Sequence, residues 1–398
     1  MITSKKSDLG GTEEALTGGE PCEWQRELQH NVTTVEGLEE YLPLTPAERR
    51  DLEQVTAAHP MNIPRYYLEL IDPGDPHDPV RKMAVPATEE LIVAGDMGAT
   101  TGDPYGDDKH DKGNGILHKY PYTALVVTTE YCSMYCRHCF RKRMVGLPND
   151  QTVKSFRQAA SYIAAHPEIK NVVMSGGDPL LLPTSALKSM LSELRGIKHL
   201  NYVRIGSRAP VVFPMRFFDD ELIELLADFN REKPLYLPTH FNHPREITPT
   251  AREAVRRLRS AGVTVNNQAV LLRGVNDAAD TLAELMDGLL RIGVNPYYLY
   301  QCMPVTRVRH HFQVPLKEGV DLVDAARAKM DGYAKRFKFI IGHDIGKLEI
   351  CGRIDDKLIL KQLHARPGHQ DESSRMLVRR LTDNGGWLDD LPECSLSS

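Results

Sequence analysis

Three cysteines lie close together in this chain, at Cys132, Cys136 and Cys139. They follow an apolar, β-branched run, Thr123–Thr129, which is typical of a buried strand. A structural zinc site normally takes four ligands as two separated pairs, and no second pair is present here. Three thiolates from one loop suit a [4Fe-4S] cluster that keeps one iron open for another ligand. The alternative interpretation is a damaged zinc knuckle or three unrelated core cysteines.

A regular alternation of strands and helices surrounds this loop and must position it. The runs that read as strands are Thr123–Thr129, Asn171–Ser175, Asn201–Gly206, Leu235–His240, Val263–Gln268 and Pro296–Gln301. Between them, apolar residues recur at helical spacing. Six βα units predict an α/β fold whose parallel sheet curls into a full or partial TIM-like (βα)6 barrel. Such barrels place their chemistry at the C-terminal ends of the strands, where the cysteines lie.

The rest of the chain divides by composition and pattern. We expect a disordered tail over residues 1–22, an N-terminal helical region over 23–94 and a Gly- and Asp-rich linker over 95–118. The barrel then occupies 119–302, a C-terminal extension on the substrate side occupies 303–366, and a polar tail occupies 367–398.

Composition excludes several classes of protein. With 398 residues, of which 41% are hydrophobic and 26% charged, the chain can bury a large core and is neither disordered nor a coiled coil. No apolar run is long enough to cross a membrane, and the N-terminus lacks the apolar segment of a secretion signal. A net charge of −5 argues against nucleic acid as a main partner. Seven cysteines, an odd number, do not indicate a disulfide framework, so we expect a cytoplasmic protein.

The cysteine loop resembles the signature of the radical S-adenosylmethionine (SAM) superfamily. The resemblance implies that the open iron chelates SAM and that one electron cleaves SAM to a 5′-deoxyadenosyl radical. It also implies that His138 packs near the adenine, and that the backbone and acid of Ser175-Gly176-Gly177-Asp178 hold the methionyl ammonium. A plain turn after a strand is the alternative for Gly176-Gly177. The candidate SAM-binding residues, all at or beyond the C-terminal ends of predicted strands, are His138, Ser175, Gly176, Gly177, Asp178, Ser207, Arg208, His240 and Asn242.

Longer strings resemble one family within that superfamily, the lysine 2,3-aminomutases. The similarity runs from about Trp24 to about Leu363 and includes Val203-Arg-Ile-Gly-Ser-Arg208 and Thr239-His-Phe-Asn-His-Pro244. It implies a radical SAM isomerase that also uses pyridoxal phosphate (PLP) and moves an amino group between neighbouring carbons of lysine or a related amino acid. It further implies a small amino-acid-like substrate, an electron donor such as a reductase, flavodoxin or ferredoxin, and a homo-oligomer.

The same resemblance suggests three catalytic residues. Arg141 stands where the family pairs an arginine with the substrate carboxylate, although a solvated basic loop is the alternative. Asp277 stands where an aspartate holds the distal ammonium of lysine, or it caps the following helix. Lys347 stands where a lysine binds PLP, although it could be an ordinary turn lysine.

The chain also departs from the family's pattern. Lys119 and Thr123 replace two arginines of the phosphate site, and Gly342 falls at or near the second aspartate, with Asp344 as a possible substitute. A radical SAM enzyme of the same family that works without PLP, by epimerisation, elimination or another rearrangement, is therefore the alternative function.

Overall fold

The structure, a computed structural model, describes residues 22–92, 98–147, 152–365 and 373–395. Its strands form one sheet in which spatial order equals chain order, from β1 to β11. Their bounds are β1 Ile116–Tyr120, β2 Thr123–Thr129, β3 Asn171–Gly176, β4 Tyr202–Ile205, β5 Leu235–Thr239, β6 Thr264–Leu271, β7 Asn295–Gln301, β8 Lys338–His343, β9 Gly346–Ile354, β10 Lys357–Ala365 and β11 Met376–Arg380.

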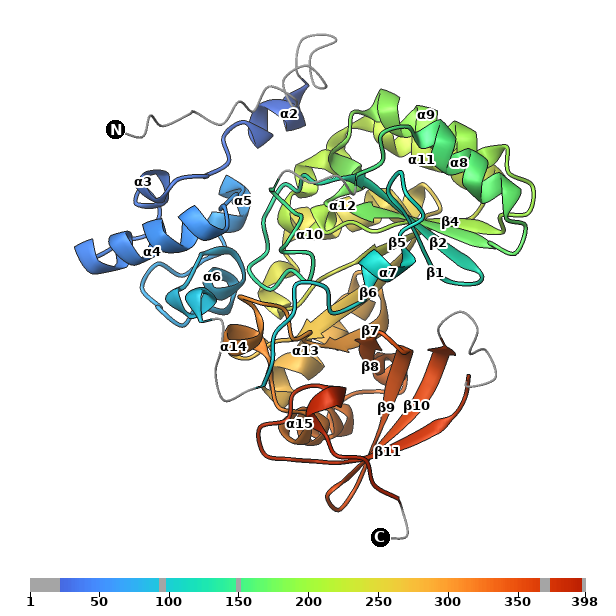
Figure 1. Cartoon of the computed structure of the whole chain (residues 1–398). Helices are drawn as coiled ribbons and strands as arrows, with labels where there is room; N and C mark the ends of the chain where they lie inside the picture. Colours follow the sequence, from blue (N-terminus) through green and yellow to red (C-terminus); the bar gives the residue numbers. More distant parts are fainter. Residues whose placement is uncertain (1–21, 93–97, 148–151, 366–372, 396–398) are drawn as a thin grey trace, which may run out of the picture.

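The N-terminal region is helical, with α4 its longest helix, and further helices alternate with the strands (Figure 1). The helices are α2 Glu23–Leu28, α3 Val35–Leu38, α4 Pro46–Ala58, α5 Arg65–Leu68, α6 Pro79–Ala84, α7 Asp107–His110, α8 Phe156–Ala165, α9 Thr184–Arg195, α10 Ala209–Val212, α11 Asp220–Glu232, α12 Pro249–Ser260, α13 Ala279–Arg291, α14 Arg309–Phe312 and α15 Leu316–Ala328. The 3₁₀ helices are η1 Thr88–Leu91, η2 Pro179–Leu181, η3 Pro214–Phe218, η4 Pro244–Glu246, η5 Ala334–Arg336 and η7 Leu388–Asp390.

The parallel part of the sheet confirms the predicted fold class. All six predicted strands are present as β2 to β7, and each pairs in parallel with the next. A further strand, β8, continues the parallel series, although its residues fall in the predicted C-terminal extension. The strands β1, β9, β10 and β11 pair antiparallel at the two ends of the series. Parallel strands in chain order, each followed by a helix, bring their C-terminal ends to one edge.

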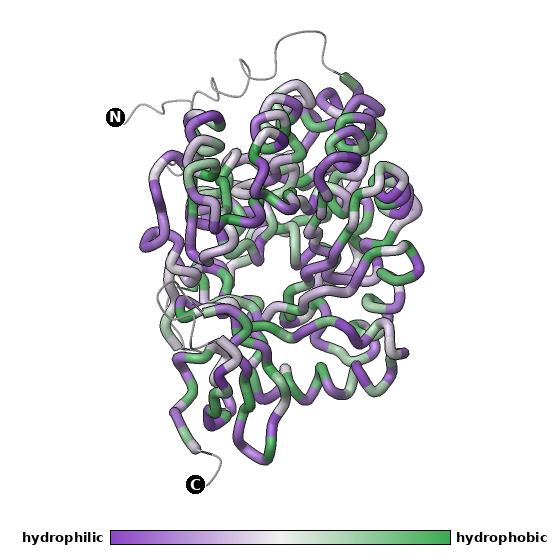
Figure 2. Tube along the Cα trace, turned by 90° about the vertical axis from the view of Figure 1, so that its right-hand side faces the viewer, coloured by the Kyte–Doolittle hydropathy of each residue, from purple (hydrophilic) through white to green (hydrophobic). Residues whose placement is uncertain are grey.

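The helices cover the sheet through one apolar face each, as their periodicity predicts. In α13 the residues Leu282, Leu285, Met286 and Leu289 are fully buried, and in α8 Ile163 is buried in the same core cluster. Hydrophilic and hydrophobic residues alternate along the outer helices, as Figure 2 shows. Burial of these apolar side chains, at about 25 cal/mol per Å², is the main force that holds helices and sheet together.

Two predicted segments differ from the observed fold. In the predicted linker, the described residues from 98 onward include α7 and the first residues of β1, which pairs with β2. In the predicted polar tail, β11 pairs with β10 and Trp387 is only 3% exposed. A short edge strand rich in arginine looks like a polar tail in the sequence, because its pairing comes from a distant segment. The predicted tail at 1–22 lies, except for Cys22, outside the described residues.

No helix in the described ranges combines the length and the apolar character that a membrane span requires.

Candidate active site

The three predicted cysteines lie together in the loop that follows β2. All three are free thiols. Burial raises the pKa of Cys132 well above its ordinary value, and the nearby charges of Cys139 and Cys136 raise it further. Burial also raises the pKa of Cys139 to about 11. The loop therefore gathers three partly buried thiols at the C-terminal edge of the parallel strands.

The donor set of this loop fits an iron–sulfur cluster. Among the described residues, no group of three His, Cys, Asp or Glu side chains converges on a single metal ion. A [4Fe-4S] cluster places each thiolate on a different iron, so its ligands stand further apart than those of one ion. The guanidinium Nη1 of Arg208 lies 2.7 Å from Cys136 Sγ, so a cation stands directly beside one of the three sulfurs.

Two glycines, Gly176 at the end of β3 and Gly177 just after it, let the backbone run directly against the cysteine loop. The N–H of Gly177 donates to the carbonyl of Thr129 at 2.6 Å. A Cβ on Gly177 would lie 2.2 Å from the carbonyl oxygen of Tyr131, and Gly176 has a φ of +115°. Both positions therefore require glycine. The carbonyl of Ser175, just before them, accepts from Thr128 Oγ1 at 3.1 Å.

The carboxylate of Asp178 is buried and already has four donors. Its Oδ1 accepts from the N–H of Leu180 at 3.1 Å. Its Oδ2 accepts from Ser207 Oγ at 2.9 Å and from the N–H groups of Arg208 and Ala209, both at 3.0 Å. Asp178 thus ties the end of β3 to the segment after β4. Its predicted contact with a SAM ammonium stays a prediction, in which the ammonium would share these oxygens.

His138 and Asn242 meet in the same region. Asn242 Nδ2 lies 3.4 Å from His138 Nε2, and His138 Nδ1 is buried without a partner among the described residues. Burial lowers the pKa of His138 well below its ordinary value, so the imidazole is neutral. Burial also lowers the pKa of His240 to about 4, and its carbonyl accepts from Arg208 Nε at 3.0 Å. A neutral ring with a free nitrogen fits the predicted neighbour of an adenine.

Lys347 lies at the start of β9, opposite Gly342 of β8. Its Nζ is 4.6 Å from the ring centre of Tyr298 and 5.7 Å from that of Tyr300. Burial lowers the pKa of Lys347 to about 7, and the charge of Arg204 lowers it further. The amine is therefore partly neutral at physiological pH, which is the state in which a lysine acts as a nucleophile.

Arg141 is 7% exposed, so the solvated-loop interpretation does not describe it. Its Nη2 lies 3.6 Å from a carboxylate oxygen of Asp107, and its Cζ lies 5.0 Å from the ring centre of Phe140. Its Nε and Nη1 are buried without hydrogen-bond partners among the described residues. An unpaired buried donor is costly, so these two N–H groups are suited to an anionic ligand.

The other residues predicted at the substrate, Asp277, Asp344 and Gly342, lie in three different surroundings. Asp277 lies near Lys82. Burial lowers the pKa of Lys82, and the negative charge of Asp277 partly offsets that effect. The carboxylate of Asp344 accepts from Lys109 Nζ at 2.6 Å. A Cβ on Gly342 would lie 2.7 Å from Tyr105 Cε2, so no room for a larger residue exists beside that ring.

The residues at the predicted PLP site match the needs of this cofactor only in part. Arg204 Nε is buried without a partner in the described part of the chain, and it can serve an anion. The ammonium of Lys119, in contrast, already donates to the carbonyls of Tyr105 and His343. Thr123 Oγ1 is paired with the amide of Asn171. The residues present therefore include an amine and one free guanidinium donor for this cofactor.

A buried ion cluster beside the cysteine loop was not predicted from the sequence. Glu90 in η1 is 0% exposed and accepts from Arg137 Nε at 2.7 Å and from Lys142 Nζ at 2.7 Å. Both cations lie on the loop, one between Cys136 and Cys139 and one just after them. Nothing local in the sequence marks Glu90, because its partners are about fifty positions away.

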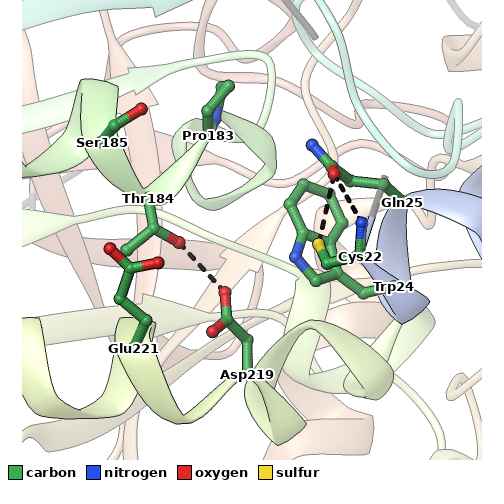
Figure 3. Close-up of a pocket in the computed structure, with 8 residues that line it drawn as sticks. All are labelled: Cys22, Trp24, Gln25, Pro183, Thr184, Ser185, Asp219 and Glu221. Carbon is green, nitrogen blue, oxygen red and sulfur yellow. Dashed lines mark hydrogen bonds between the residues drawn. The ribbon is translucent and has the colours of Figure 1, made fainter. Parts of the chain in front are cut away.

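A surface pocket lies between α2 and the N-terminal ends of α9 and α11 (Figure 3). Its lining residues are Cys22, Trp24, Gln25, Pro183, Thr184, Ser185, Asp219 and Glu221. None of them belongs to the predicted site. Thr184 Oγ1 donates to Asp219 Oδ2 at 3.0 Å, and the guanidinium of Arg216 stands 4.2 Å from the ring centre of Trp24. The pocket marks where α2 is anchored to the barrel.

Comparisons with known proteins agree with this geometry. The radical SAM superfamily matches residues 126–286. An L-lysine 2,3-aminomutase of Clostridium subterminale is 41% identical over 312 residues, which are 78% of this chain and 73% of that protein. The L-lysine 2,3-aminomutase of Acetoanaerobium sticklandii is 39% identical, with 78% of this chain and 73% of that protein covered. A glutamate 2,3-aminomutase of Clostridioides difficile (strain 630) is 36% identical over 330 residues, 82% of this chain and 75% of that protein.

The match to the superfamily covers the strand that precedes the cysteine loop, the loop itself and the glycines packed against it. Superfamily membership implies SAM, a [4Fe-4S] cluster, a small-molecule substrate and an electron donor. The identities extend well beyond this core into both flanking regions. The chain therefore belongs to the radical SAM aminomutase family, whose members are isomerases that include the lysine and glutamate 2,3-aminomutases.

Proposed function

We propose that this protein is an amino-acid 2,3-aminomutase that holds a [4Fe-4S] cluster on Cys132, Cys136 and Cys139 and holds PLP on Lys347. When bound, SAM at the cluster supplies the hydrogen-abstracting radical, and PLP carries the migrating amine. The observation that carries the proposal is the environment of Lys347. A partly buried lysine whose pKa is about 7, with a second cation nearby and tyrosine rings around it, is suited to attack a carbonyl.

The chain's own residues have distinct tasks in this proposal. Arg141 binds the substrate carboxylate through its unpartnered Nε and Nη1, and the ring of Phe140 below the guanidinium keeps it in place. Arg204 offers its free Nε to the phosphate of the cofactor. Tyr298 and Tyr300 exclude water from the amine of Lys347, which protects a radical reaction from side reactions.

We propose further that the substrate is a relative of lysine that lacks a distal ammonium. The position at or near which the resemblance places the second aspartate is Gly342, which has no side chain, and the carboxylate of its possible substitute, Asp344, pairs with Lys109. The surroundings of Gly342 are instead the ring of Tyr105 and the side chain of Met303. The ring of Tyr105 lies 6.2 Å from that of Phe140, next to Arg141. Two rings and a thioether favour an uncharged or apolar side chain.

The alternative, a family member that works without PLP, is favoured by one observation. The ammonium of Lys119, at a predicted phosphate position, is occupied by two carbonyls of the protein. A second cation is thus not available to the phosphate unless Lys119 changes partners.

The test is PLP content and its point of attachment in protein reconstituted without oxygen. Borohydride reduction followed by peptide mapping should find PLP on Lys347 at about one per chain. Lys347→Ala should abolish the adduct, and the exposed Lys335→Ala should leave it unchanged. SAM cleavage to 5′-deoxyadenosine without any adduct would overturn the PLP half and support the alternative. Iron that survives Cys132→Ala, Cys136→Ala or Cys139→Ala would overturn the cluster half.

A further inference from the structure

Arg208 makes a contact that its predicted role as a SAM-binding residue does not explain. It follows β4 and reaches the cysteine loop, where its Nη1 donates to Cys136 Sγ at 2.7 Å. The side chain is only 10% exposed. A guanidinium keeps its positive charge in proteins. The guanidinium is therefore a fixed cation in direct contact with one of the three thiols.

Two further contacts fix the orientation of this guanidinium. Arg208 Nε donates to the carbonyl of His240 at 3.0 Å, and Nη2 donates to Glu246 Oε1 at 2.7 Å. A guanidinium has five N–H groups in one plane, so three contacts from three different nitrogens allow only one placement. One N–H of Nη1 remains for another acceptor, so contact with the sulfur and contact with SAM are compatible.

Glu246, which holds the guanidinium, is itself fully buried and held by other donors. Tyr67 in α5 donates its hydroxyl to Glu246 Oε1 at 2.7 Å. The N–H groups of Asn242 and His243 donate to Glu246 Oε2 at 2.6 and 3.0 Å. A continuous chain of contacts thus runs from the N-terminal helical region through Tyr67, Glu246 and Arg208 to the sulfur of Cys136. Buried polar chains of this kind are rigid when every member is satisfied.

We propose that Arg208 is a positioning residue that hydrogen-bonds the Cys136 thiolate and raises the reduction potential of the cluster. This rests on the proposed cluster at the three cysteines. Reduction adds one electron, taken from an external one-electron donor, and increases the negative charge on the cluster and its sulfur ligands. A nearby cation and N–H donor stabilise the reduced form more than the oxidised form. No covalent bond forms or breaks in this step.

The experiment is a potentiometric titration of reconstituted protein without SAM, followed by electron paramagnetic resonance. Arg208→Met should make the midpoint potential more negative by at least about 59 mV. For a one-electron step this is a tenfold change in the redox equilibrium. Arg208→Lys, which keeps a cation and a donor, should restore part of the shift. Arg245→Met is the matched control, because Arg245 lies next to Glu246 but contacts Asp78 instead of a sulfur.

A second variant keeps the proposal falsifiable if Arg208→Met loses its cluster. Tyr67→Phe removes a donor from Glu246 and an acceptor from Arg208 Nη2, which loosens the guanidinium without removing it, so the midpoint potential should shift in the same direction by a smaller amount. Iron and sulfide are counted per chain in each sample. An unchanged midpoint potential in Arg208→Met protein that holds its full iron content would overturn the proposal. An unchanged midpoint potential in Tyr67→Phe would also overturn it. A wild-type protein without the cluster spectrum would instead overturn the proposed function itself.

Discussion

Replacing Glu90 by glutamine should destabilise the protein and loosen the cysteine loop. The carboxylate is 0% exposed and lies between two buried cations, Arg137 and Lys142. Burial alone raises the pKa of Glu90, but the charges of Lys142 and Arg137 outweigh that effect and lower the pKa to about 2. Compared with an ordinary value of 4.5, this corresponds to about 3 kcal/mol in favour of the ionised form in the folded state.

Not all of that energy is a net gain in stability. Burial lowers the pKa of Lys142 to about 8, so keeping Lys142 charged costs a comparable amount. Removing the carboxylate leaves both cations buried without a counter-ion, and breaking a buried pair in this way typically costs about 3–5 kcal/mol. We therefore expect Glu90→Gln to lower the free energy of unfolding by about 3 kcal/mol at pH 7. Because the pKa of Glu90 is depressed, its contribution is present above pH 4.5 and is lost as the pH falls towards 2.

The measurement is urea-induced unfolding followed by tryptophan fluorescence, since Trp24 in the N-terminal region is only 4% exposed. The control is Glu89→Gln, a change at the exposed neighbouring residue. The deficit of Glu90→Gln should shrink between pH 7 and pH 9, because Lys142 can then lose its proton, and Lys142→Met should rescue part of it. A Glu90→Gln protein within about 1 kcal/mol of the Glu89→Gln control would refute the reasoning.

Three further predictions concern the site itself. The rate of PLP capture should rise with pH and level off slightly above pH 7, because burial lowers the pKa of Lys347 to about 7; a rise that continues to pH 10 would contradict this environment. Gly177→Ala should sharply reduce the iron bound per chain, because the new Cβ would lie 2.2 Å from the carbonyl oxygen of Tyr131; Gly332→Ala, with no atom within 4 Å, is the control. Amino acids with uncharged side chains should be converted to β-amino products at least about tenfold faster than lysine, measured as kcat/KM. A loss of about 1.4 kcal/mol of binding free energy, from the missing partner of the lysine ammonium, suffices for that ratio. Equal rates would show that lysine finds a carboxylate elsewhere.

The sequence predicted the parallel sheet and the cysteine loop because both depend on local signals. Each parallel strand is a short apolar run, and the helices between the strands have one apolar face, as in the strand Asn171–Gly176 and the helix Thr184–Arg195 that follows it. The cysteine spacing is likewise contained in eight consecutive residues. The antiparallel strand β11 was missed because its pairing partner, β10, and not its own composition makes it a strand.

The charged residues around the cluster site were harder to interpret from the sequence. The basic run that includes Lys142 reads as a solvated loop, yet Lys142 is 3% exposed. Its burial depends on Glu90, which lies in a different part of the chain and in an unremarkable polar context. Likewise Arg208 was expected at SAM, and the structure places it first on Cys136. Pairings between distant residues leave no periodic signal, so only the three-dimensional structure shows them.

The N-terminal helical region, predicted as a separate segment, is better understood as part of the cluster site. Residues of this region form hydrogen bonds with the backbone of the cysteine loop at several positions. These contacts are Asn31 Nδ2 to the carbonyl of Ser133 at 2.7 Å, Asn62 Nδ2 to the carbonyl of Cys132 at 2.9 Å, the N–H of Tyr135 to the carbonyl of Asn62 at 3.0 Å, and the N–H of Arg137 to the carbonyl of Met83 at 2.9 Å. These hydrogen bonds hold the backbone of the cysteine loop through residues that lie outside the loop. The glycines of the barrel and the N-terminal region both contact this loop, so we expect binding of the proposed cluster and docking of this region to be thermodynamically linked.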